Sequence, residues 1–275
     1  MNRDFATVNG NCLSYVLEGE PGRPVVFLSH PLAVNLDVWG YQVPLLRASF
    51  RVLRLDLRGH GLSGFPPGPC RLEDLAADVA GLLDHLGIAE VTFVGLSVGG
   101  MIAQVFALEH PERVTALALC STGSRTEEPA RQNLDRRIAR AEAEGMTSQV
   151  EGTLPNWFTP PFLASSPLTT RWVAGLIRST SVAGFVGCCR AIQQLDVMER
   201  LSEIQKPTLI MPGSEDQNFT VALAEGMQRR IPGAELKPVR GAAHLGNVEQ
   251  IHTFNETLLA FLNGHRGRNG DHLER

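Results

Sequence analysis

The stretch Val91-Thr92-Phe93-Val94-Gly95-Leu96-Ser97-Val98-Gly99-Gly100-Met101 decides the fold of this 275-residue chain. An apolar, β-branched run ends in Gly-x-Ser-x-Gly and continues into a segment with helical apolar spacing. A serine at a sharp strand-to-helix turn has a strained backbone. The chain can make so tight a turn only if the residues two before and two after the serine lack a Cβ. Gly95 and Gly99 meet this condition. The stretch therefore predicts a nucleophile elbow that lifts Ser97 above the end of a strand.

Further apolar runs of strand type lie on both sides of this stretch, at the spacing of βαβ units. These strand-type runs occupy residues 25–28, 50–57, 114–120, 207–212 and 235–239. Helical apolar spacing occurs at 71–86, at 98–108, in a segment that ends at residue 230, and at 248–262. Continuous apolar runs are typical of strands buried on both faces of a parallel sheet. Asn9-Gly10, within the alternating segment 5–17, adds an antiparallel hairpin. We expect an α/β fold with a mostly parallel sheet flanked by helices.

The sequence pattern changes between residues 125 and 200 to amphipathic helix with prolines and exposed-looking aromatic residues, and it contains no buried-strand pattern. Those aromatic residues are Trp157, Phe158, Phe162 and Trp172. We expect a helical cap at 125–200 that lies over the carboxyl ends of the strands, where Ser97 would be. The core would comprise residues 1–124 and 201–264, and the polar residues 265–275 would form a disordered tail.

The composition is that of an ordinary globular protein. With 25 basic and 29 acidic residues and no basic cluster beyond 265–268, nothing indicates nucleic-acid binding. The chain has no charged-then-apolar leader and no run of ~18 apolar residues, so we expect a cytoplasmic protein that does not bind a membrane. The histidines, acidic residues and five cysteines lack metal-binding spacing, and we expect neither metal nor cofactor.

A serine hydroxyl needs an imidazole to take its proton and a carboxylate to orient that imidazole. For the elbow fold, the order along the chain is serine, acid, histidine. Asp216 and His244 each stand just past a predicted strand, and such loops converge at the carboxyl edge of the sheet. We predict a catalytic triad of Ser97, Asp216 and His244, with Glu215 as the alternative carboxylate.

Two backbone N–H groups are expected to bind the oxyanion of the reaction. The first belongs to Val98, at the start of the helix after Ser97. The second comes from the loop after strand 25–28, where Pro31 has no N–H, so Leu32 is the predicted donor and Ala33 the alternative. We interpret His30 in that loop as structural. The segment 58–64 is interpreted as a glycine-rich turn, since it lacks the Gly-Lys-Ser/Thr and the following helix of a phosphate-binding loop.

Five segments together resemble a particular family, the 3-oxoadipate enol-lactonases, and the likeness covers most of residues 5–262. The segments are Phe50-Arg51-Val52-Leu53-Arg54-Leu55-Asp56-Leu57-Arg58-Gly59-His60-Gly61, Gly95-Leu96-Ser97-Val98-Gly99-Gly100-Met101, Trp157-Phe158-Thr159-Pro160, Gly187-Cys188-Cys189-Arg190-Ala191-Ile192 and Ala242-Ala243-His244-Leu245-Gly246-Asn247-Val248-Glu249. The resemblance implies an α/β-hydrolase fold, the triad named above, and a small acidic enol-lactone from aromatic catabolism as substrate.

The chain departs from this family where an acidic substrate would bind. Family members usually have an arginine directly before the cap's Trp-Phe and another shortly after the cysteine pair, where this chain has Asn156 and Gln193. Neither side chain can replace a guanidinium in bidentate carboxylate recognition. We predict Asn156, Trp157, Arg190 and Gln193 as substrate-binding residues, with Arg190 or Arg125 as candidates to supply the missing charge.

We therefore expect a serine hydrolase that cleaves a small ester or lactone through an acyl-enzyme, similar to the enol-lactonases. A carboxylesterase, a C–C bond hydrolase or a perhydrolase-like enzyme with a neutral substrate is the alternative on the same triad. A non-catalytic ligand-binding protein of the same fold is the alternative from another class.

Overall fold

Eight strands form one sheet through the centre of the molecule, which is described by a computed structural model over residues 3–265. The strands are β1 (Asp4–Val8), β2 (Asn11–Glu18), β3 (Val25–Ser29), β4 (Arg51–Leu55), β5 (Val91–Leu96), β6 (Val114–Cys120), β7 (Thr208–Met211) and β8 (Glu235–Leu236). Their order is β1-β2-β4-β3-β5-β6-β7-β8, and only β1–β2 and β2–β4 pair antiparallel. The predicted mostly parallel sheet is confirmed.

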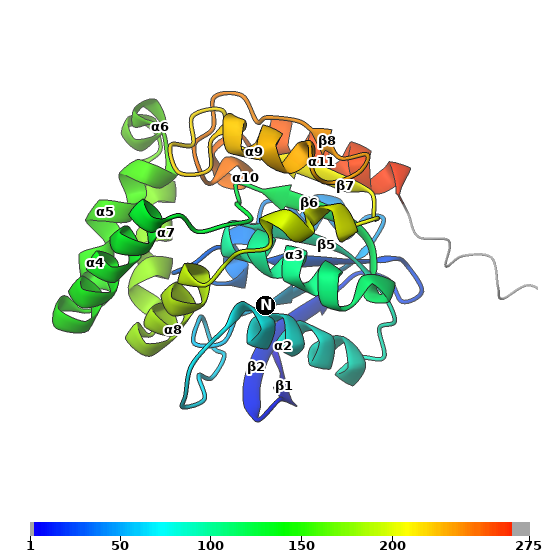
Figure 1. Ribbon diagram of the computed structural model, residues 1–275, viewed down its shortest axis with the longest axis horizontal. Coiled ribbons are helices and arrows are strands. Elements are labelled where there is room, and N and C mark those ends of the chain that lie inside the picture. The colour runs from blue at the N-terminus through cyan, green and yellow to red at the C-terminus, as the bar shows by residue number, and fades with distance from the viewer. Residues whose placement is uncertain (1–2, 266–275) are drawn as a thin grey trace, which may run out of the picture.

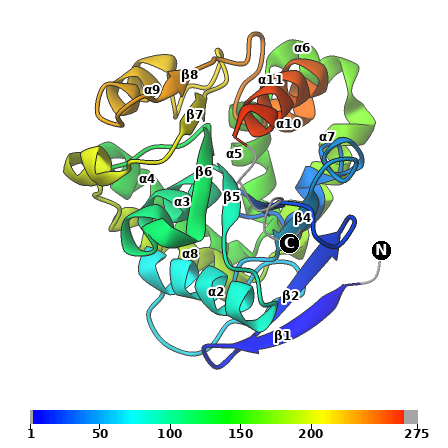
Figure 2. The ribbon, with the colours of Figure 1, turned by 90° about the vertical axis from the view of Figure 1, so that its right-hand side faces the viewer.

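Helices cover both faces of the sheet. They are α1 (Val43–Leu46), α2 (Leu72–His85), α3 (Val98–Glu109), α4 (Glu128–Glu144), α5 (Thr147–Trp157), α6 (Pro160–Ser165), α7 (Pro167–Ser179), α8 (Val182–Gln193), α9 (Val221–Gln228), α10 (Gly246–Glu249) and α11 (Ile251–Gly264). In Figure 2, α2 and α3 lie on one face of the sheet, whereas α11 lies on the other. Phe254 of α11 contacts Trp39, which is fully buried, with ring centroids 6.2 Å apart.

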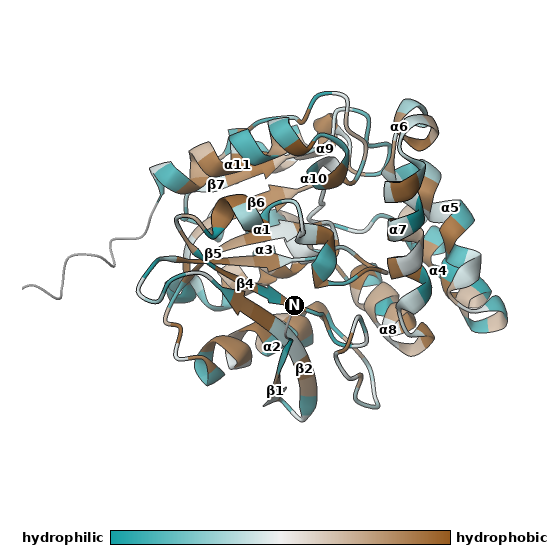
Figure 3. Ribbon diagram, turned by 180° about the vertical axis from the view of Figure 1, so that it is seen from behind, coloured by the Kyte–Doolittle hydropathy of each residue, from teal (hydrophilic) through white to brown (hydrophobic). Residues whose placement is uncertain are grey.

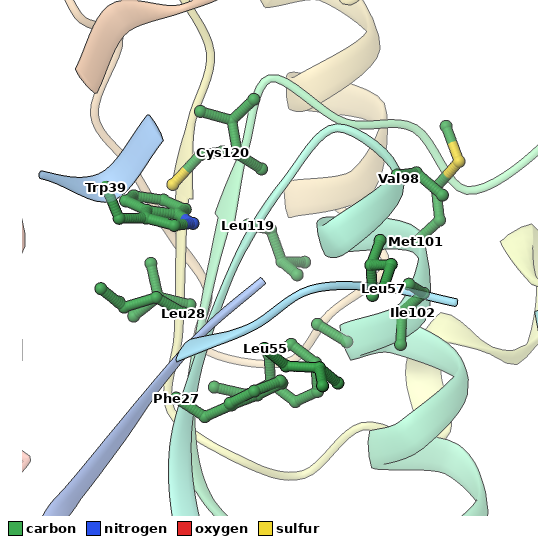
Figure 4. Close-up of a cluster of buried hydrophobic side chains, with 14 of the residues drawn as sticks. Phe27, Leu28, Trp39, Leu55, Leu57, Val98, Met101, Ile102, Leu119 and Cys120 are labelled. Carbon is green, nitrogen blue, oxygen red and sulfur yellow. The ribbon is translucent and has the colours of Figure 1, made fainter. Parts of the chain in front are cut away.

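The core is centred on β5, all six residues of which are buried. Phe93 of β5 meets Phe27 of β3 edge to face, at 4.7 Å between ring centroids. Figure 4 shows side chains of β3, β4, β6 and α3 gathered in this core. Burial on both faces explains the continuous apolar runs, and it fixes the strand end that carries Ser97.

The predicted hairpin between β1 and β2 is confirmed. Asn9 and Gly10 have φ values of 50° and 73°. Positive φ at both central residues is what a type I′ hairpin turn requires, and Asn-Gly supplies it at low cost.

Helices α4 to α8 lie together beside the carboxyl ends of the strands (Figure 1). Figure 3 shows mostly hydrophobic strands, whereas α4 and α5 carry hydrophilic stretches. The start of α8 touches the turn after β4 backbone to backbone: a Cβ on Gly184 would lie 2.2 Å from the Gly59 carbonyl oxygen. Ser181 Oγ also donates to that oxygen, at 2.9 Å. This segment is therefore anchored directly on the sheet's loops.

Several details differ from the predictions. The last predicted helix is divided into α10 and α11, since Gln250 has φ −123° and ψ 58°. The strand expected at 235–239 ends at Leu236, and Val239 forms only an isolated bridge. Trp157 and Phe158 are buried, and their rings stack on those of His244 and Phe162, respectively. Of the predicted tail, residues 266–275 lie outside the described residues, and the His265 side chain contacts the Phe261 carbonyl.

Candidate active site

Ser97 lies between β5 and α3 in a backbone conformation that side-chain-bearing residues rarely adopt, with φ 57° and ψ −118°. Its N–H donates to the Cys120 carbonyl at 2.9 Å, and Thr122 Oγ1 donates to the Ser97 carbonyl at 2.7 Å. These two hydrogen bonds, to the end of β6 and to the loop after it, hold the strained turn in place. The Ser97 side chain lines a cavity at this edge of the sheet.

The two glycines of the elbow are required by close backbone approach. A Cβ on Gly95 would lie 2.2 Å from the Gly99 carbonyl oxygen, and one on Gly99 would lie 2.3 Å from the Ser29 carbonyl oxygen. Neither clash can be relieved by moving a side chain, since both involve backbone atoms. The steric reason given for the Gly-x-Ser-x-Gly spacing is therefore confirmed.

Asp216 and His244 are joined by a buried hydrogen bond of 2.7 Å between Asp216 Oδ2 and His244 Nδ1. The other carboxylate oxygen accepts the backbone N–H groups of Asn218 and Phe219 at 2.9 and 3.0 Å. Burial would raise the pKa of the Asp216 carboxyl, but His244 and these N–H donors outweigh it, and the pKa lies below its ordinary value. Glu215 instead is exposed and contacts Ser214, so Asp216 is the carboxylate placed against His244.

Two aromatic side chains contact the ring of His244. Trp157 and Phe219 stack on it with centroid distances of 5.9 and 5.5 Å. The Leu245 N–H donates to the Trp157 carbonyl at 3.1 Å, which fixes the loop as well as the ring. Since a carboxylate only accepts hydrogen bonds, Nδ1 of His244 carries the proton and Nε2 remains as the acceptor.

The cavity that Ser97 lines has a volume of about 700 Å³, which suits a small organic molecule. His244 and Leu32 also line it, whereas much of its polar wall comes from α4 and α5. The polar side chains of that wall are Asn133, Arg136, Arg137, Arg140, Ser148, Gln149, Thr153 and Asn156. The cavity thus joins the elbow to the helices above it.

A sequence profile described as the alpha/beta hydrolase fold matches residues 24–250 of the chain. The chain belongs to the α/β-hydrolase family. The 3-oxoadipate enol-lactonase 2 of Acinetobacter baylyi is 33% identical over 260 residues, which are 94% of this α/β hydrolase and 96% of the relative. The predicted similarity to the enol-lactonases is therefore confirmed.

Two solved structures superpose on this α/β hydrolase over nearly its whole length. The enol-lactonase from Burkholderia xenovorans LB400 has a TM-score of 0.91 and 35% identity, over 94% of this chain and 100% of that chain. A thermophilic esterase from Thermogutta terrifontis, solved with malate bound, has a TM-score of 0.91 and 27% identity, over 97% and 100% of the two chains.

The loop after β3 presents one backbone donor to the cavity of this α/β hydrolase. The Ala33 N–H donates to His60 Nε2 at 3.2 Å and is therefore occupied. The Leu32 N–H has no acceptor among residues 3–265, and Leu32 lines the cavity. Of the two donors considered from the sequence, the geometry leaves Leu32 available.

Two fully buried histidines support this loop. His30 Nε2 accepts the Leu57 N–H at 3.0 Å and its Nδ1 donates to the Pro31 carbonyl at 2.8 Å. Burial lowers the pKa of His30 to about 4 and that of His60 to about 3, so both rings are neutral at neutral pH. The interpretation of His30 as structural agrees with these contacts, and the turn that contains His60 braces the same loop.

The four predicted substrate-binding residues divide into two pairs. Asn156 and Trp157 line the cavity, but Arg190 and Gln193 do not. Arg190 Nη1 donates to Asp135 Oδ1 at 2.6 Å, and the Gln193 side chain donates to a carbonyl of α4. Arg190 and Gln193 therefore lie against α4, and the structure does not bring them to the cavity.

Several arginines line the cavity, and one of them, Arg137, was not among the residues predicted from the sequence. Arg125 reaches the cavity, but its guanidinium is paired with Asp196 at 2.8 Å and Glu199 at 3.3 Å. Arg137 also lines the cavity, and no carboxylate of residues 3–265 forms an ion pair with it. Its position on α4 was a usable signal, because Arg137 stands beside Ile138 and three residues after Leu134, which are both buried.

Among residues 3–265, no group of three or more His, Cys, Asp or Glu side chains is arranged to hold a metal ion. No single helix in that range is long and apolar enough to cross a membrane, and α7 and α8 reach such a length only as a pair bent by 92°. Cys12 is exposed, and the other four cysteines are buried as free thiols.

Proposed function

We propose that this α/β hydrolase cleaves a small ester or lactone by nucleophilic attack of Ser97. The observation that carries the proposal is the buried hydrogen bond between His244 and Asp216 at the cavity that Ser97 lines. Residues 1–124 and 201–264 form the core that supplies these three groups, and residues 125–200 form the cap. The elbow alone would support only an assignment of the fold. The oriented imidazole of His244 adds a base that can take the proton of the Ser97 hydroxyl.

Acylation begins when Ser97 Oγ attacks the carbonyl carbon of the substrate and His244 Nε2 takes its proton. Asp216 keeps the imidazole in the required tautomer and stabilises the imidazolium. The tetrahedral intermediate collapses with breakage of the acyl C–O bond, and His244 returns the proton to the leaving oxygen. In an enol-lactone that oxygen is an enol, which tautomerises to the ketone and remains tethered to the acyl group.

Deacylation repeats these steps with water. His244 Nε2 takes a proton from the attacking water, the C–O bond to Ser97 breaks, and the proton passes to Ser97 Oγ. In both steps the negative charge on the carbonyl oxygen is stabilised by the N–H groups of Leu32 and Val98. The first is supported by the unused Leu32 donor at the cavity, and the second by the place of Val98 as the first residue of α3.

The substrate class is taken from the relatives and from the cavity. Two enol-lactonases are similar to the chain over more than nine-tenths of its length. The cavity of about 700 Å³ suits a substrate of that size. We therefore assign an enol-lactone of the type formed in aromatic catabolism.

A neutral carboxylic ester is the second candidate substrate. Asn156 is neutral where the enol-lactonases usually have an arginine, and its amide donates to the Gly152 carbonyl at 2.7 Å. The similar esterase from Thermogutta terrifontis supports the same chemistry on an ester.

Initial rates with 3-oxoadipate enol-lactone and with a neutral ester of similar size test this proposal. Ser97→Ala should lower kcat for the better substrate by at least ~10³-fold, because the acyl-enzyme can no longer form. Thermal unfolding of the variant should match that of the wild type. Retained turnover would exclude Ser97 as the nucleophile, and preference for the neutral ester would assign the second substrate class.

A further inference from the structure

The guanidinium of Arg137 is the feature of the cavity that the proposed reaction does not use. Its Nε donates to Gln149 Oε1 and its Nη2 to Thr153 Oγ1, both at 3.3 Å, and its carbon lies 5.2 Å from the centre of the Phe185 ring. Both acceptors are neutral, and both bonds are long. A guanidinium has five N–H donors, so three of them are without an acceptor among residues 3–265.

A cation in this setting is costly without an anion. Arg137 is half-buried, its burial lowers the pKa of the guanidinium, and no carboxylate among residues 3–265 forms an ion pair that offsets this effect. Buried charges in proteins are normally paired, because desolvation of an isolated ion is strongly unfavourable. Since Arg137 lines the cavity, an anion that enters from solvent can reach it.

Other arginines of the cap lack this combination of a place at the cavity, partial burial and no ion pair; Arg136, for example, lines the cavity but is exposed. Arg190 is half-exposed and paired with Asp135 outside the cavity. Arg125 is paired with two carboxylates, and Arg140 is exposed and paired with Glu144. Gln149 and Thr153 are themselves buried, so the polar pocket around Arg137 is built into the contact between α4 and α5.

We infer that Arg137 binds a carboxylate of the substrate, at the end of the molecule away from the bond that Ser97 attacks. The planar fork of a guanidinium matches a carboxylate through two parallel hydrogen bonds, and the long bonds to Gln149 and Thr153 orient that fork. The inference rests on the proposed function, because it places the anion on the substrate of Ser97. It adds the residue that would recognise a carboxylate of that substrate, since Asn156 and Gln193 are neutral.

Two esters with acyl chains of the same length test the inference. They are 4-nitrophenyl hydrogen succinate, which carries a carboxylate, and 4-nitrophenyl pentanoate, which ends in a methyl group. Arg137→Gln should lower kcat/KM for the succinate ester by roughly 10- to 100-fold, mainly through KM, and leave the pentanoate value unchanged. Arg137→Lys should retain part of the preference, because it keeps the charge but loses the fork.

Arg190→Gln is the matched control, since it removes an equal charge from the same cap outside the cavity. It should leave both values unchanged. An equal loss on both esters in Arg137→Gln would assign a structural role to Arg137 and overturn the inference, as would an unchanged ratio of the two values.

Binding measurements separate this inference from the proposed function. Isothermal titration calorimetry of Ser97→Ala with glutarate should show binding. Addition of Arg137→Gln to that variant should weaken the affinity for glutarate at least 10-fold. If the wild type cleaves neither ester but glutarate binds in this way, the reaction is wrong and the carboxylate site stands. If glutarate binds equally with and without Arg137, the site is wrong.

Discussion

The carboxylate of Glu249 joins Thr159, at the start of α6, to the loop that carries His244. Glu249 Oε1 accepts the backbone N–H of Thr159 at 3.0 Å and its hydroxyl at 2.5 Å. Glu249 Oε2 accepts the N–H of Ala243, the residue before His244, at 2.8 Å. A single side chain thus fixes the distance between the cap and the imidazole, which makes Glu249 a positioning residue.

Replacing Glu249 should affect turnover through His244. Glu249→Ala leaves the donors on Thr159 and Ala243 without their acceptor and should lower the free energy of unfolding by about 1–3 kcal/mol. We expect kcat to fall more than KM changes, because the imidazole loses its position while the cavity wall remains. Thermal unfolding and initial rates measure both effects. Glu256→Ala, at an exposed position of α11, is the control. A rise in KM with unchanged kcat would contradict the positioning role.

The choice of carboxylate can be tested directly. Asp216→Asn should lower kcat by roughly 10³- to 10⁴-fold, because an amide favours the wrong tautomer of His244. Glu215→Gln, at the adjacent exposed position, should leave kcat unchanged. Initial rates on the same ester decide the matter, and the reverse ranking of the two variants would transfer the role to Glu215.

Stability should depend on pH through His30 and His60. Burial depresses their pKa values to about 4 and about 3, so the folded protein keeps both rings neutral while the unfolded chain binds protons below about pH 6.5. The free energy of unfolding should therefore fall between pH 6.5 and about 4, by up to about 1.4 kcal/mol per pH unit for each histidine.

Urea unfolding at several pH values measures that slope. His60→Gln should reduce it by the share of one histidine, whereas His252→Gln, at an exposed position of α11, should not. A free energy of unfolding that stays constant over this range would show that neither ring resists protonation.

Two glycines of the cap should respond in opposite directions to the same change. A Cβ on Gly184 would meet the backbone of Gly59, and Gly184→Ala should cost about 1–3 kcal/mol by overpacking. Gly175 is exposed within α7 with nothing near its Cβ position, so Gly175→Ala should add about 0.5–1 kcal/mol. Thermal unfolding compares them; equal effects would show that α8 can move away from the turn.

The parts of the site that the sequence could predict are those that depend on the order of strands. Parallel strands bring their carboxyl ends to one edge, so a serine at an elbow and later loops with Asp216 and His244 had to converge there. The hairpin and the elbow were predictable for a similar reason, because positive φ and close backbone approach restrict the residue type.

The cap was less predictable, because helical spacing shows which residues share a face but not which partner that face meets. Arg190 and Arg137 both stand on amphipathic helices. The contact between α4 and α8 places Arg190 against Asp135 at the surface, whereas the contact between α4 and α5 encloses Arg137. Similarly, the apolar spacing of residues 248–262 continues through Gln250, where only the backbone angles reveal the break.

The backbone contact between Gly59 and Gly184 also limits how this cap can be exchanged in evolution or by recombination. An inserted cap shares no covalent junction with residue 59, yet a side chain at either position of this pair would collide with the backbone of the other. A chimera that takes residues 125–200 from a relative must therefore carry glycine at the position of Gly184. Otherwise it must also take the turn around residue 59 from that relative. Cap exchange can therefore change the substrate range of such chimeras only where both positions 59 and 184 allow this close backbone contact.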